Sequence, residues 1–246
     1  MVANWNRCLG ESQGALIHIL HGDDAVAPGF YQAILRLADR YPEAALHATG
    51  FGPLGKGTPI DQRGSEDRAQ FMADAASGRF ILAGSRHCCG SVVIADWAVR
   101  RLGTFREEYR YGPDEEAYLR YAAAGGLAFD ARSLYLERLH GEQSRATAWL
   151  KPDFVATYMQ GRVDGASHYG DAITRVAKES TARRVISVAV TLALRGERSS
   201  ALQRLRDLVN CHPECASWLR YRLAEVACRV PAAQVAARLR RRYLLS

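Results

Sequence analysis

One run of residues directs the interpretation of the whole chain: Ala15-Leu16-Ile17-His18-Ile19-Leu20-His21-Gly22-Asp23-Asp24. Its first part, residues 15–20, is mostly apolar and predicts a buried strand. The strand leads into a loop with two adjacent carboxylates, and Pro28 then begins an amphipathic helix that extends to Arg40. This order places the carboxylates at the C-terminal end of a strand, where open α/β sheets bind ligands.

Asp23 and Asp24 allow two interpretations. Oxygen ligands at this position suit Mg²⁺ or Mn²⁺ bound to a diphosphate, because the metal neutralises charge that develops on the leaving group. Asp24 can also be an ordinary turn residue before the helix. The local sequence leaves both interpretations open.

The pattern of apolar residues divides the chain into two parts. The first part predicts strands at 44–49, 80–82, 91–94 and 133–137, a loop at 50–58, and helices at 6–12, 28–40, 65–77, 95–102 and 114–124. The second part predicts helices only, at 169–180, 182–195, 199–209, 214–228 and 232–243. We therefore expect an α/β domain over residues 1–150 and a helical, Arg-rich extension over residues 151–246.

The positive charge lies in the extension. The whole chain has a net charge of +7, and residues 181–246 contain 13 Arg against 4 acidic residues. No nucleic-acid-binding motif accompanies these arginines, so no nucleic-acid partner is expected. The basic helix at 235–245 has two open interpretations, because it can pack on the protein or lie on an anionic membrane surface.

Several classes of protein are excluded. No apolar stretch reaches the length of a membrane-spanning helix, and the N-terminus lacks the layout of a signal peptide, so a cytoplasmic location is expected. The six cysteines do not form the framework of a small secreted protein. Residues 50–56 resemble part of a phosphate-binding loop, but Gly57 stands where that loop needs Ser or Thr.

Two later segments carry candidate site residues. Asp114 begins a predicted helix, where an acidic residue favours the helix dipole and where a carboxylate can also act as a general base. Arg138 and His140 follow the strand at 133–137. They can hold a phosphate oxygen or lie in a solvated loop.

In their order along the chain, these segments resemble the bacterial family 2 glycosyltransferases of the GT-A fold. The matching segments are residues 4–31, residues 91–105, Asp114 with Arg120 six positions later, and Arg138-x-His140 followed by Ser144. The resemblance implies a partial GT-A, Rossmann-like mixed sheet that carries the all-α extension.

The resemblance also implies a metal site. Asp23, with Asp24 beside it, would ligate Mn²⁺ or Mg²⁺ on the diphosphate of a nucleotide-sugar donor. His21 stands where many relatives carry an acidic residue, and it would ligate the metal or bind the sugar.

The remaining matches imply roles on the two sides of the transferred sugar. Asp114 would be the general base that deprotonates the acceptor hydroxyl, and Arg120 would contribute to substrate binding. Arg138 and His140 would stabilise the departing diphosphate. The implied reaction inverts the configuration at the anomeric carbon.

Relatives carry a nucleotide-binding half before the segment that begins this chain, so we expect residues 1–246 to bind nucleotide sugars weakly. The predicted function is a metal-dependent, inverting glycosyltransferase with a saccharide or glycolipid acceptor, in surface polysaccharide synthesis. It would be cytoplasmic, with possible contact to the inner face of the membrane through the basic helices. The alternative is a catalytically inactive remnant or a non-catalytic interaction module.

Overall fold

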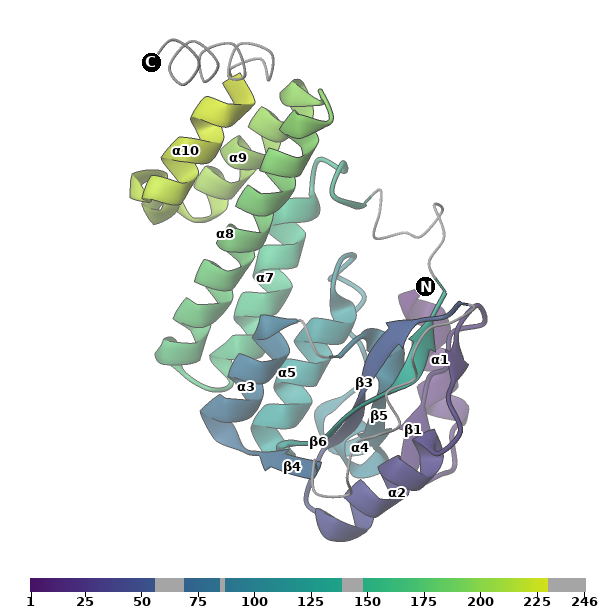
Figure 1. Ribbon diagram of the computed structural model, residues 1–246. Coiled ribbons are helices and arrows are strands. Elements are labelled where there is room, and N and C mark those ends of the chain that lie inside the picture. The colour runs from purple at the N-terminus through teal and green to yellow at the C-terminus, as the bar shows by residue number, and fades with distance from the viewer. Residues whose placement is uncertain (56–68, 85–86, 139–147, 230–246) are drawn as a thin grey trace, which may run out of the picture.

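A six-stranded mixed sheet forms the N-terminal part of the protein (Figure 1). The computed structural model describes residues 1–55, 69–84, 87–138 and 148–229. The strands are β1 (Leu16–His18), β2 (Ala25–Val26), β3 (Leu46–Pro53), β4 (Ala69–Met72), β5 (Val92–Ala95) and β6 (Leu127–Glu137). Their order is β1-β5-β3-β6-β2, and β4 pairs with the first half of β6.

Helices cover this sheet and form the C-terminal part. The sheet carries α1 (Val2–Glu11), α2 (Phe30–Arg40), α3 (Asp74–Ala83), α4 (Asp96–Leu102) and α5 (Pro113–Gly125). The C-terminal part contains α7 (Phe154–Ser167), α8 (Asp171–Leu194), α9 (Arg198–Cys211), a 3₁₀ turn η3 (Pro213–Ser217) and α10 (Leu219–Arg229). The expected fold class, a mixed α/β sheet with an all-α extension, is confirmed. Within the described ranges, no helix is long and apolar enough to cross a membrane.

Strand β6 pairs with three other strands of the sheet. It pairs in parallel with β3 on one side, while β2 and β4 pair antiparallel with its second and first halves. The register between β3 and β6 shifts on both sides of Gly50. A Cβ atom at Gly50 would lie 3.0 Å from the carbonyl oxygens of Ala131 and Arg132, so glycine permits this close approach.

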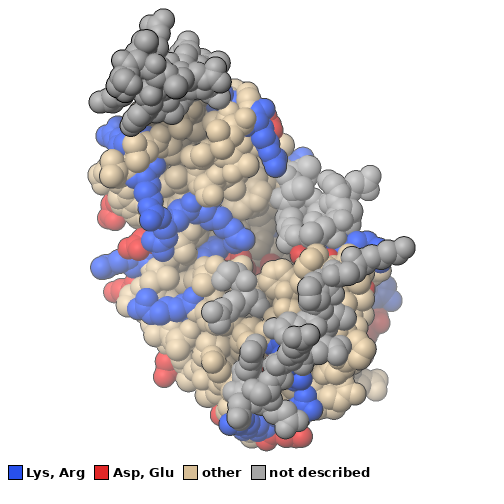
Figure 2. Space-filling view, in the orientation of Figure 1, with Lys and Arg blue, Asp and Glu red and all other residues tan. Residues whose placement is uncertain are grey.

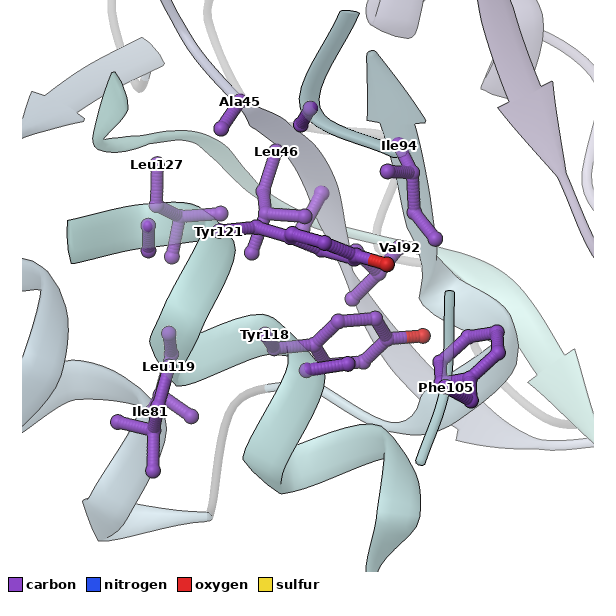
Figure 3. Packing of buried hydrophobic residues seen from close by; sticks show 14 of the residues in the cluster. Ala45, Leu46, Ile81, Val92, Ile94, Phe105, Tyr118, Leu119, Tyr121 and Leu127 are labelled. Carbon is purple, nitrogen blue, oxygen red and sulfur yellow. The ribbon is translucent and has the colours of Figure 1, made fainter. Parts of the chain in front are cut away.

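Both faces of the sheet are buried. Val92 and Ile94 of β5 pack with α5 on one face, and Val93 between them packs with α2 on the other. Figure 3 shows the first face, where Tyr118 and Tyr121 of α5 are directed toward the sheet. Alternate burial on two covered faces explains why this strand is continuously apolar in sequence.

Three sequence expectations are wrong at this level. The predicted helix at 65–77 is replaced by β4 and the start of α3, and the predicted strand at 80–82 lies within α3. Pairing with β6, which is distant in sequence, overrides the local pattern of β4. The loop expected from residue 50 is in fact strand β3 up to Pro53.

The extension also differs from expectation in detail. Residues 171–194 form one helix where two were predicted, because no Gly or Pro interrupts them and the hydroxyl of Thr181 donates to the carbonyl of Ala177. Helix α7 was not predicted. The helix expected at 232–243 and the basic segment 235–245 lie outside the described residues, so their membrane contact stays a prediction.

Arg162 of α7 connects the extension to the helices that pack on the sheet. Its side chain is fully buried, and its guanidinium lies 3.0 Å from Glu115 of α5 and donates to the Leu82 carbonyl of α3 at 2.7 Å. It also donates to Tyr158 and to Ser180 of α8. One side chain therefore joins four helices through charge-assisted hydrogen bonds.

We expect Arg162→Met to lower the free energy of unfolding by about 3 kcal/mol, because it leaves Glu115 without its buried partner. Urea denaturation measures this loss. The matched control is Arg183→Met, whose partly exposed pair with Glu179 on α8 contributes less than about 1 kcal/mol. Equal losses in the two variants would contradict the role given to Arg162.

Candidate functional site

The predicted loop carboxylates lie beside the end of β6. The side chain of Asp24 accepts hydrogen bonds from the Tyr135 hydroxyl and, at 2.8 Å, from the backbone N–H of Arg138. The Nε of Arg138 donates to the carbonyl of Asp23 at 2.9 Å. Nδ1 of His21 lies 3.5 Å from Asp24 Oδ2. The structure thus brings together four of the predicted site residues from two distant segments.

Tyr135 is a member of this group that the sequence analysis did not single out. Burial, with the Asp24 carboxylate next to it, raises the pKa of Tyr135 well above its usual value, so the phenol stays protonated and donates. A Cβ atom at Gly90 would lie 2.0 Å from the Tyr135 oxygen, so the turn before β5 passes directly over the ring. The sequence signal was a tyrosine between two leucines, Leu134 and Leu136.

His21 is held in place by helix α1. Its ring stacks on Trp5 of α1 at 5.7 Å between centroids and 8° between planes. Its Nε2 is buried and has no hydrogen-bond partner among the described residues. A buried ring nitrogen without a partner is uncommon in folded proteins and is consistent with a ligand contact.

Asp114 lies at the start of α5, beside the same turn. Burial, with the neighbouring charge of Glu115, raises the pKa of Asp114 to about 6. Burial and the nearby Asp114 carboxylate raise the pKa of the Cys89 thiol well above its usual value. Tyr118, one turn further along α5, donates to the Cys89 carbonyl at 2.9 Å. A carboxylate with this pKa is ionised at neutral pH and can accept a proton.

The turn at residues 88–91 therefore connects the two groups of predicted residues. Its Gly90 touches Tyr135, the partner of Asp24, and the Asp114 carboxylate raises the pKa of its Cys89. Burial raises the pKa of Cys88 to about 12, so this thiol also stays protonated. Neither cysteine has the electropositive, exposed surroundings of a reactive thiol.

Arg120 is buried and directed inward. Its guanidinium pairs with Glu116 at 2.8 Å and donates to the backbone carbonyls of Leu102 at 2.6 Å and Thr104 at 2.9 Å. These contacts make Arg120 a positioning residue for the loop after α4. Substrate binding by Arg120 stays a prediction, and His140 lies outside the described residues.

Glu115 faces the helical extension. It accepts a hydrogen bond from the Tyr158 hydroxyl at 2.9 Å and lies 3.0 Å from Arg162 and 3.4 Å from Arg184. Asp114 and Glu115 therefore point to different partners, and the charge of Arg184 opposes the rise that Glu115 causes in the pKa of Asp114.

The donor set suits a metal ion only in part. Among the described residues, no group of three or more His, Cys, Asp and Glu side chains could hold a metal ion. Mg²⁺ in proteins is commonly bound by one or two carboxylates together with substrate phosphates and water. Asp23 and Asp24, with His21 beside them, fit a metal that arrives with a diphosphate, and they do not form a closed metal site.

The fold is similar to that of the glycosyltransferase TarS. The chain is similar to a solved structure of TarS residues 1–349 from S. aureus in complex with UDP, at 14% sequence identity and a TM-score of 0.57, over 91% of this chain and 67% of that one. A longer TarS structure matches at 13% identity and a TM-score of 0.58, over 90% of this chain and 40% of that one. No family model matches the sequence. No curated protein matches it either.

The raised pKa of Asp114 predicts how stability depends on pH. Between the usual value of 3.8 and about 6, the folded protein keeps a proton that the unfolded chain has released, so the free energy of unfolding falls as pH rises through this range. Asp114→Asn removes this loss. Relative to wild type, the variant should gain about 2 to 3 kcal/mol between pH 4 and pH 7 in urea denaturation.

Asp39→Asn, at an exposed position on α2, is the control for removing a carboxylate. If Asp39→Asn gains as much free energy of unfolding as Asp114→Asn, or if Asp114→Asn gains none, the environment of Asp114 does not raise its pKa.

Proposed function

We propose that the protein is a metal-dependent, inverting glycosyltransferase of GT-A type. It moves a sugar from a nucleotide-sugar donor to a saccharide or lipid-linked acceptor, in the synthesis of a surface polysaccharide. The observation that carries the proposal is the contact of Asp24 with the start of the Arg138 segment, together with the raised pKa of the Asp114 carboxylate. The likeness to TarS, which was solved with UDP, supports a nucleotide-sugar donor.

The donor diphosphate is assigned to the loop after β1. Asp23 and Asp24 would hold Mn²⁺ or Mg²⁺ together with the diphosphate, and the metal would neutralise charge on the leaving group. The guanidinium of Arg138, which donates to the Asp23 carbonyl, supports binding of an anion at the same place. Tyr135 and the Arg138 backbone fix the orientation of the Asp24 carboxylate.

The acceptor is assigned to the start of α5. Asp114 accepts the proton of the acceptor hydroxyl while its oxygen attacks the anomeric carbon. The bond from that carbon to the diphosphate oxygen breaks, and the electron pair leaves with the diphosphate. Attack from the side opposite the leaving group inverts the configuration, and the turn at 88–91, between the Asp24 and Asp114 groups, is consistent with such a two-sided site.

Calorimetric titration with UDP tests the donor site. In the presence of Mn²⁺ we expect wild type to bind UDP weakly, with a Kd of about 1 mM, and Asp24→Asn to bind about tenfold more weakly still. Mn²⁺ without UDP should give no saturable signal, because the described residues form no closed site. Asp39→Asn serves as the control. UDP binding that is absent in wild type, or unchanged in Asp24→Asn, would contradict the proposal.

A further inference from the structure

A polar pocket lies in the helical extension, between the first half of α8 and η3. Its volume is about 380 Å³, and its lining includes Arg175, Lys178, Glu179, His212, Glu214 and Trp218. None of these residues belongs to the candidate site described above. In Figure 2, basic and acidic side chains lie next to one another along the left edge of the molecule, at the height where Figure 1 places α8.

His212 shows that the pocket contains an unsatisfied polar group. The residue is only 8% exposed, and its Nε2 has no hydrogen-bond partner within the part of the chain that the structure describes. Its ring packs edge-on against Trp218 at 5.4 Å. Buried side-chain nitrogens are normally hydrogen-bonded, so this one calls for a ligand atom or an ordered water.

The charged groups of the pocket provide both donors and acceptors. Arg175 and Lys178 of α8, and Glu214 of η3, form no ion pair among the described residues, while Glu179 pairs with Arg183. With Asp171, the lining holds three carboxylates and two cations. This balance does not favour an anion such as phosphate. It favours a neutral ligand whose groups both donate and accept hydrogen bonds.

We propose that this pocket binds a neutral saccharide unit of the acceptor chain. Sugar hydroxyls both donate and accept, and the C–H face of a sugar ring can pack on the indole of Trp218. The saccharide chemistry rests on the pocket itself, whereas its identification as part of the acceptor rests on the proposed function. Helix α8 also carries Arg184, the partner of Glu115, about 9 Å along the helix axis from Lys178. An oligosaccharide of a few units can span that length.

The test is an array of neutral and phosphorylated bacterial oligosaccharides probed with the full chain. Wild type should bind at least one neutral oligosaccharide, and Trp218→Ala should weaken that binding about tenfold. Glu214→Gln, at an exposed position, should also weaken it. Glu107→Gln, exposed and outside the pocket, is the matched control and should bind as wild type does.

Three results would overturn the proposal. Wild type could bind no oligosaccharide, both pocket variants could bind as wild type does, or only phosphorylated oligosaccharides could bind and be displaced by inorganic phosphate. Asp24→Asn separates this proposal from the proposed function. If wild type does not bind UDP but still shows sugar binding that depends on Trp218, the proposed function is wrong and the proposal for this pocket is supported.

Discussion

Three carboxylates follow one another at the start of α5, and consecutive helix residues point about 100° apart, so each must find a different environment. Glu116 is fully buried and pairs with Arg120 inside the sheet domain. Glu115 pairs with Arg162 of the extension. Asp114 has a raised pKa and in turn raises the pKa of Cys89 in the turn before β5. The position of α5 thus determines the burial of Glu116 in the core, the contact of Glu115 with the extension and the environment of the candidate base Asp114.

This arrangement makes the helical extension part of the site's electrostatics. Glu115 raises the pKa of Asp114, and Arg184 of α8 lowers it. Loss of the Arg184 charge alone would raise the pKa of Asp114 further. The extension therefore influences the pKa of Asp114 on α5, in addition to packing against that helix (Figure 1).

The sequence predicted the features that local chemistry determines. The strand before Asp24, the helix after Pro28 and the helix that begins near Asp114 follow from apolar periodicity and from Pro and Gly at their ends. Strand β4 was not predictable, because it depends on pairing with β6, and the partner of Asp24 at Tyr135 is 111 residues away in sequence. The inward direction of the Arg120 side chain likewise follows only from tertiary contacts.

The most direct test of the account is turnover of UDP-sugars with water as the acceptor, measured as UDP release in the presence of Mn²⁺ for wild type and Asp114→Asn. The account predicts measurable release by wild type and a loss of about 10²- to 10⁴-fold in Asp114→Asn, with UDP affinity unchanged. Release that is equal in the two proteins, or absent from wild type, would contradict the assignment of α5 as the carrier of the catalytic base.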